Sequence, residues 1–113
     1  MNILTEYRKG IMFFRVKGYL NKATYRKLEE EINVLINNCG INNIVINLEE
    51  VTKIDMKGIS TLFHVYECIK KLKGNIYLYL GKNEIKRVLK NVRVFNYMDL
   101  IDSELNAFDL VKI

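Results

Sequence analysis

The sequence predicts an α/β fold with a mostly parallel central sheet, an antiparallel hairpin at its N-terminal end and about four helices. Short apolar runs of β-favouring residues alternate with longer segments in which apolar residues recur every three or four positions. Only a tight Lys9-Gly10 turn separates the first two runs, whereas helix-length segments separate the later ones. Strands joined by such segments pair in parallel, because a crossover helix carries the chain back along one sheet face.

The N-terminal part is predicted to form the hairpin and the first helix. Residues 3–7 and 11–16 are rich in β-favouring side chains, and we expect Gly18 to end the second strand. Asn21 is a favourable N-cap residue, so we expect the first helix to begin there and Gly40 to end it. The expected apolar face of this helix is Tyr25, Leu28, Ile32, Leu35, Ile36 and Cys39.

A buried strand and a second helix follow. Residues 44–46, together with Leu48, form an apolar run without a polar face, which is typical of a central strand covered on both sides. Residues 49–53 are turn-like, residues 55–58 lead into the helix, and Gly74 is expected to close it. The predicted stripe of this helix is Ile59, Leu62, Phe63, Tyr66, Ile69 and Leu72.

The C-terminal part is predicted to add two strands and two helices. Residues 76–80 form an apolar strand, after which Asn83 is suited to cap a third helix. Residues 100–101 are expected to form a brief strand, and Ser103 to cap the last helix. The expected inner faces are Ile85, Val88, Leu89 and Val92 in the third helix, and Leu105 and Phe108 in the last.

Length and composition indicate one folded domain spanning residues 1–113, since half of the chain is hydrophobic and 27% is charged. No apolar run approaches the ~20 residues that cross a bilayer, so we expect a cytoplasmic protein without a membrane span. Cys39 and Cys68 form no closely spaced pair, so we expect two reduced thiols and no metal site.

The net charge of +5 raises the question of nucleic-acid binding. The lysines and arginines are spread along the whole chain and interleaved with glutamates, as on a solvated surface. The densest run, residues 82–93, lies on a predicted helix and contains no recognition motif or aromatic stacking platform. We therefore expect no nucleic-acid partner.

No constellation of catalytic residues is evident. The single histidine, His64, falls opposite the apolar stripe of its helix, and residues 29–31 are glutamates that point around a helix and cannot converge. Gly81-Lys82 lacks the remaining residues of a phosphate loop. Tyr77 and Tyr79 share one strand face, where core packing is the simpler role. We expect neither enzymatic activity nor a cofactor.

The run Asp55-Met56-Lys57-Gly58 stands out, because it lies between a buried strand and a helix. Backbone N–H groups and the helix dipole make such a corner a natural place for an anion. Asp55 is suited to cap the helix, and Gly58 permits a tight entry. Lys57 is unusual, because a cation near an exposed helix N-terminus is unfavourable by about 0.3–1 kcal/mol.

Around this corner the chain resembles the STAS domain family, of the anti-sigma factor antagonist type. Residues 48–59 resemble the family signature, in which an apolar strand leads through a short linker to Asp-Ser-Ser-Gly-Leu. Residues 18–21 resemble the Gly-Glu-Leu-Asp segment before the first helix, and residues 74–78 resemble the Gly-Gly-x-Leu strand. The resemblance covers nearly the whole chain in order, and it implies a STAS-like fold.

The resemblance implies a non-enzymatic, bacterial-type transcription regulator that binds an anti-sigma factor or related serine kinase, with other STAS proteins as further partners. The family phosphoacceptor is the second serine of Asp-Ser-Ser-Gly, and the matching Lys57 cannot take a phosphate. Met56 replaces the other serine, and Asn21 replaces an acidic residue of the partner surface. Ser60 and Thr61 remain as candidate phosphorylation sites.

We therefore expect a partner-binding surface without phosphorylation at the usual family position. Its predicted residues are Asn21, Asp55, Met56, Lys57, Gly58, Ser60 and Thr61. Two alternatives stay open. The chain could be a STAS scaffold subunit of a signalling or transport complex, or a small module that binds an anion or nucleotide through the N–H groups of the corner.

Overall fold

The structure is a computed structural model that describes residues 1–111. Its strands and helices follow the predicted order, with one short 3-10 helix added between the third helix and the last strand. The elements are β1 (Asn2–Arg8), β2 (Ile11–Leu20), α1 (Tyr25–Cys39), β3 (Asn43–Ile54), α2 (Met56–Lys71), β4 (Asn75–Tyr79), α3 (Ile85–Asn91), η1 (Val94–Asn96), β5 (Asp99–Ile101) and α4 (Asn106–Leu110).

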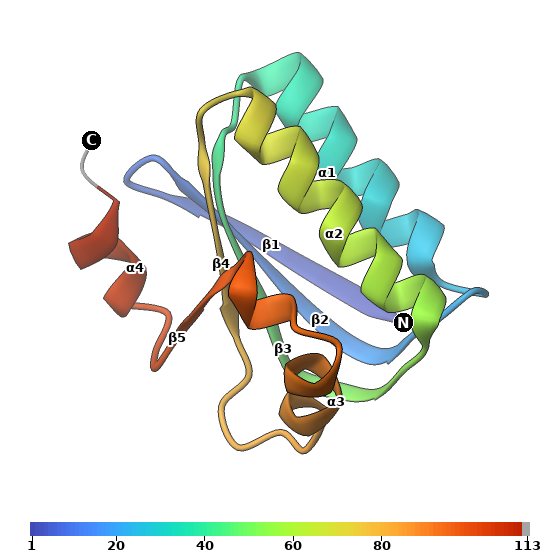
Figure 1. Ribbon diagram of the computed structural model, residues 1–113. Helices are drawn as coiled ribbons and strands as arrows, with labels where there is room; N and C mark the ends of the chain where they lie inside the picture. The colour runs from blue at the N-terminus through green and yellow to red at the C-terminus, as the bar shows by residue number, and fades with distance from the viewer. Residues whose placement is uncertain (112–113) are drawn as a thin grey trace.

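The strands form one mixed sheet in the order β1-β2-β3-β4-β5. β1 pairs antiparallel with β2, and every other neighbouring pair is parallel, which confirms the predicted fold class. Lys9 and Gly10 both have positive φ, the conformation that joins twisted strands in a two-residue hairpin turn. Helices α1 and α2 lie side by side on one sheet face, and α4 lies on the other (Figure 1).

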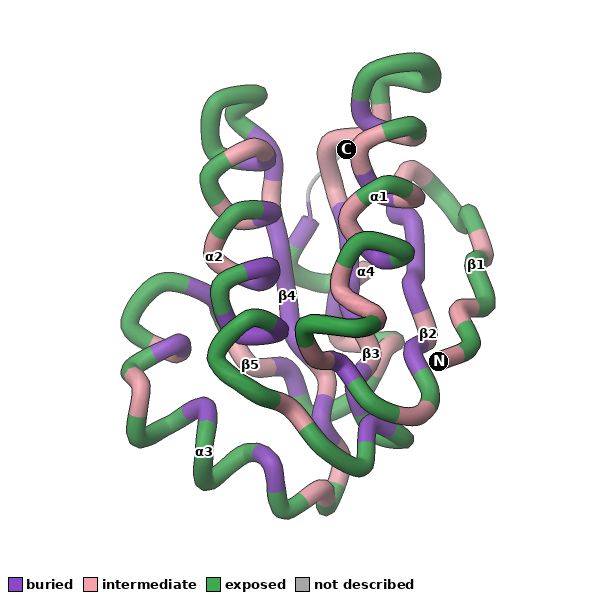
Figure 2. Tube along the Cα trace, turned by 90° about the vertical axis from the view of Figure 1, so that its right-hand side faces the viewer, coloured by how far each residue is buried: buried purple, intermediate pink, exposed green. Residues whose placement is uncertain are grey.

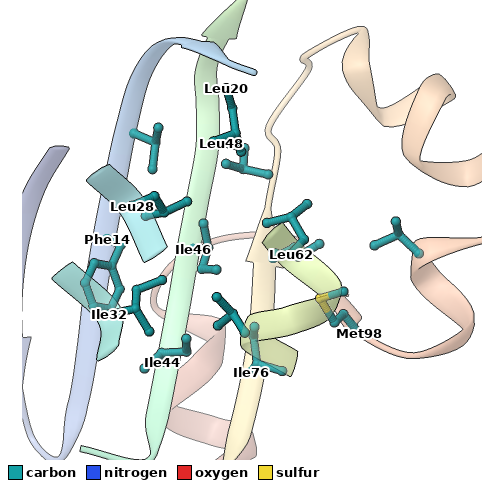
Figure 3. Packing of buried hydrophobic residues seen from close by; sticks show 14 of the residues in the cluster. Phe14, Leu20, Leu28, Ile32, Ile44, Ile46, Leu48, Leu62, Ile76 and Met98 are labelled. Carbon is teal, nitrogen blue, oxygen red and sulfur yellow. The ribbon is translucent and has the colours of Figure 1, made fainter. Parts of the chain in front are cut away.

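Apolar side chains cover both faces of the sheet because neighbouring strand residues point in opposite directions. The main core fills the space between the sheet and the pair α1 and α2, and Figure 3 shows Phe14, Ile46 and Leu62 pointing into it. On the opposite face Phe13 lies 5.6 Å from the Phe108 ring, measured between centroids. This smaller cluster comprises Ile11, Phe13, Val45, Tyr77, Ile101, Ala107 and Val111.

Two strand boundaries differ from the prediction. Gly18 does not end β2, which continues to Leu20 with Gly18 at a φ of +106°. Residues 49–53 are not a turn but part of β3, and they pair with the end of β2. The register shifts at two points in this pairing, so polar and apolar residues no longer alternate along the segment. Without that alternation its sequence pattern is typical of a turn.

Helix capping was predicted in part. Gly40 ends α1 in the left-handed conformation, and Asn83 Oδ1 and Ser103 Oγ accept bonds from backbone amides at the starts of the last two helices. α1 begins at Tyr25 and not at Asn21, because the Asn21 side chain closes the preceding turn through the Ala23 amide instead.

Four residues predicted on inner helix faces are exposed instead. Cys39 is the last residue of α1. Leu72 lies past the end of α2, Val88 is on the outer side of α3, and Leu105 precedes α4. α3 and α4 have only seven and five residues, so each buries little more than one turn and periodicity could not separate the inner face from the outer one.

Candidate functional site

The corner at residues 55–58 is organised by the Asp55 carboxylate. Its Oδ1 accepts a hydrogen bond from the Gly58 amide at 2.9 Å, which caps α2 as predicted. Its Oδ2 accepts one from the Lys22 amide at 3.1 Å, and the Asp55 amide donates to the Leu20 carbonyl at 3.3 Å. The segment between β2 and α1 is therefore tied to the start of α2.

The backbone donors around Asp55 lower its pKa below the ordinary value of an aspartate, the Gly58 amide most strongly and the Lys22 amide next among the donors. The carboxylate is therefore ionised at neutral pH and favours the bonded geometry. It also takes up one amide at the start of α2, that of Gly58, and one in the segment before α1, that of Lys22. An external anion would have to compete with this carboxylate for the donors that the anion-binding alternative requires.

Gly58 is buried, and it allows α2 to approach the end of β2 closely. A Cβ atom added at this position would lie 2.3 Å from the Leu20 carbonyl oxygen and 2.9 Å from Ile54 Cγ1. Real Cβ atoms do not come so close to backbone, so the glycine sets the spacing between the corner and the segment that follows β2.

Lys57 is exposed, and its Nζ lies 4.6 Å from the centroid of the Tyr25 ring. This cation–π contact joins the start of α2 to the start of α1. Lys53 Nζ lies 5.7 Å from the Tyr19 ring centroid, so a second lysine is paired with a tyrosine nearby. Met56 is 66% exposed and adds an apolar side chain to this basic surface.

The two hydroxyl residues of the first turns of α2 have different environments. Ser60 is exposed, and its Oγ donates to the Met56 carbonyl at 2.8 Å. Thr61 is only 2% exposed, and its Oγ1 lies 3.1 Å from the Lys57 carbonyl and 3.4 Å from Glu29 Oε2. Of the two, Ser60 is the hydroxyl open to solvent.

A groove of about 360 Å³ lies beside the corner. It is lined by Asn21, Thr52, Lys53, Ile54, Asp55, Ile85 and Val88. The predicted site residues Asn21 and Asp55 thus meet in one depression, although they are 34 positions apart. The contribution of α3 was not predicted. α3 contributes Ile85 and Val88, and Val88 is 41% exposed although the sequence pattern predicts it on the inner face.

The remaining candidates for chemistry do not line this groove. The side chain of His64 is half exposed, with its Nε2 3.9 Å from Glu29 Oε1 and 3.8 Å from Cys68 Sγ. Within residues 1–111 no group of three or more His, Cys, Asp or Glu side chains is arranged so that it could hold a metal ion, and both cysteines are free. No helix in that range has the length and hydropathy needed to traverse a bilayer.

Fold and corner together define a small α/β domain whose distinctive feature is a capped strand-to-helix corner beside an open groove. The model of the STAS domain family matches residues 2–107, so the chain belongs to the STAS domain family. The predicted family resemblance is thereby confirmed over nearly the whole chain.

Known relatives agree with this assignment. The chain is 21% identical to an anti-sigma F factor antagonist of Paenibacillus polymyxa, over 100% of this chain and 97% of that protein. An anti-sigma factor antagonist from Mycobacterium paratuberculosis superimposes with a TM-score of 0.85 at 21% identity, covering 97% of this chain and 92% of that one. A sulfate transporter family protein from Wolinella succinogenes gives 0.76 at 14% identity, covering 91% and 85%. At these identities the structural matches show a shared fold.

Proposed function

We propose that the chain acts as an anti-sigma factor antagonist that docks onto an anti-sigma factor or related serine kinase and is not phosphorylated at the usual family position. The observation that carries the proposal is the surface around the corner, where Asn21, Asp55 and Lys53 line one groove. The family resemblance matches the phosphoacceptor to Lys57, which has no hydroxyl group. The full-length similarity to an anti-sigma F factor antagonist supports it.

The docking surface has a definite chemical character. Lys53 lines the groove beside the ionised Asp55, whose carboxylate accepts hydrogen bonds from backbone amides, and the exposed Lys57 lies two residues further along. The groove floor supplies apolar contact through Ile54 and the α3 side chains. The partner surface that matches it has an apolar side chain surrounded by acidic ones. Such charge complementarity speeds the encounter of the two proteins and selects the partner.

A charge reversal tests this surface directly. We expect Lys57→Glu to weaken binding to the anti-sigma factor about tenfold or more, since it removes an attractive contact and adds a repulsive one. Lys71→Glu, at the other end of α2, is the matched control and should leave the affinity unchanged. Isothermal titration calorimetry with each variant measures the difference. Equal affinities for the two variants would exclude the corner as the docking surface.

A kinase assay tests the absence of phosphorylation. We expect no phosphate on the wild-type chain after incubation with the partner kinase and ATP, and phosphate on Lys57→Ser, which restores an acceptor hydroxyl. Mass spectrometry locates the modified residue. Ser60→Ala is the control for the exposed hydroxyl one helical turn away, and phosphate on wild-type Ser60 would contradict the proposal.

A scaffold role is the second candidate, because the same fold occurs in a sulfate transporter family protein. A scaffold subunit forms a stable large assembly with other proteins, whereas an antagonist exchanges partners. Light scattering on material isolated from the native cell distinguishes the two: a persistent large particle favours the scaffold.

A further inference from the structure

The edge strand β1 is open on one side. Within the described residues it pairs only with β2, so the backbone groups along its other side have no strand partner. Its pairing with β2 runs through seven consecutive residues without a register shift. The strand is largely exposed, as Figure 2 shows by its colouring, and it presents Leu4 and Tyr7 at 69% and 56% exposure.

Proteins normally protect such an edge. Short length, bulges, proline and unpaired charges all discourage the addition of another strand. The opposite edge strand, β5, has only three residues and is protected by its shortness. β1 lacks these features: it has seven residues and no proline, and both of its charged residues are paired. Glu6 lies 2.8 Å from Arg15, and Arg8 lies 3.7 Å from Glu6.

A groove runs beside the open edge. It has a volume of about 420 Å³ and lies between β1 and α1, lined by Ile3, Thr5, Glu30, Glu31, Val34 and Leu35. Val34 is 53% exposed although it is apolar. A strand added along β1 would place every second side chain on this face of the sheet, over the groove.

We propose that two copies of this chain associate through antiparallel pairing of their β1 strands. The register that uses all seven residues places Thr5 on the two-fold axis. It sets Ile3 opposite Tyr7 of the second copy on the groove face, which is a favourable apolar and aromatic pair. On the other face Leu4 lies opposite Glu6 of the second copy and Asn2 opposite Arg8.

The strand is therefore complementary to itself. No two like charges lie directly opposite each other in this register, and each Glu6 carries its own Arg15 partner. The association satisfies the open backbone groups and covers the groove in both copies at once, as a two-fold interface requires. One strand and part of one helix make a small interface, so the dimer is concentration-dependent.

Substitution of Leu4 tests both the interface and its register. Leu4→Glu places like charges opposite Glu6 of the second copy twice, and we expect it to raise the dimer Kd by roughly 2- to 30-fold. Leu4→Lys places opposite charges there, so its Kd should be clearly lower than that of Leu4→Glu. Leu105→Glu, at a residue of similar exposure (64%) before α4, should dimerise like the wild type.

Sedimentation velocity from about 1 µM to about 1 mM gives each Kd, and circular dichroism confirms that each variant is folded. A wild-type chain that stays monomeric over this whole concentration range overturns the proposal, and the β1 edge is then available only to a strand of another protein. A dimer in which the Leu4 variants do not differ also overturns it. Thr5→Cys, combined with Cys39→Ser and Cys68→Ser, should form an intermolecular disulfide on mild oxidation, and failure to do so excludes Thr5 from the axis.

Discussion

Single residues set the geometry of the corner, and Asp55 contributes most. Its carboxylate caps α2 and holds the segment before α1 at the same time. We expect Asp55→Ala to lower Tm, whereas Asp55→Ser should retain more stability because serine is also a good N-cap residue. Thermal unfolding at pH 7 measures both variants. Equal losses in the two would show that the cap bond to Gly58 is not the stabilising contact.

The Asp55 contribution should also depend on pH with a definite sign. Its pKa is lowered in the folded chain by the amide hydrogen bonds, so the folded state favours the ionised form. The stability is fully present above the unfolded-state pKa of about 3.9 and is lost as the pH falls through the lower folded pKa. The Tm difference between wild type and Asp55→Ala should therefore shrink in acid.

Gly58 is the second determinant at this scale. An exposed glycine inside a helix is usually improved by alanine, but here the added Cβ meets the Leu20 carbonyl. We expect Gly58→Ala to destabilise the fold by about 1–3 kcal/mol, the typical cost of forcing an atom into a packed space. Urea unfolding measures this, with the exposed Ser60→Ala as control. A stabilised Gly58→Ala would show that the corner relaxes without cost.

Among the elements, α4 depends most on one contact. Arg15 of β2 donates from Nε and Nη2 to the Glu104 carboxylate at 2.9 and 2.7 Å, and Asn47 Nδ2 donates to the same carboxylate at 2.7 Å. Glu104 precedes α4. These contacts of Glu104 with Arg15 and Asn47, here called the clasp, hold the last helix over the sheet face opposite α1 and α2.

The clasp predicts acid sensitivity. The Arg15 hydrogen bonds lower the pKa of Glu104, and its side chain is only 22% exposed. Stability from the clasp is therefore complete above the unfolded pKa of about 4.3 and is lost as the pH falls through the lower folded value. We expect Glu104→Gln to cost about 1–2 kcal/mol at pH 7 and almost nothing near pH 2. Urea unfolding across this range, with Asp102→Asn as control, checks it.

Most helices and strands could be predicted from the sequence, because the apolar residues in each long segment follow the spacing of either a helix or a strand. The end of β3 could not, since its register shifts remove the alternation that identifies a strand. A distant residue, Asn83, helps to hold this irregular end of β3 in place. Its Nδ2 donates to the Leu48 and Val51 carbonyls at 2.8 and 2.6 Å. A contact across 35 positions leaves no local signal.

In the whole molecule, the protection of backbone amides against hydrogen exchange should decrease from the centre of the sheet toward its edges. β3 has neighbours on both sides, and its Val45 and Ile46 are fully buried on opposite faces. We expect the slowest hydrogen exchange in β2, β3 and β4, and faster exchange in β1 and α4 at low protein concentration. Exchange followed by mass spectrometry tests this order. β1 exchanging as slowly as β3 in dilute solution would contradict it.

The candidate site could be predicted only where it is local in sequence. The capping by Asp55 followed from one strand-to-helix junction, and the family resemblance added Asn21. The part played by α3 could not be predicted, because it depends on how the strand order brings α3 beside the corner. The contact of Lys57 with the Tyr25 ring could not be predicted either, because it forms only when α1 and α2 pack side by side.

The clasp between Arg15 and Glu104 joins residues 89 positions apart, and this separation bears on biosynthesis. During translation the β2 side of the contact is made well before the α4 side. Until then Phe13, Val45 and Tyr77 lack the cover of Ala107 and Phe108. A ribosome-bound or prematurely terminated chain therefore shows an apolar sheet face to chaperones and proteases, whereas a chain that has closed the clasp does not.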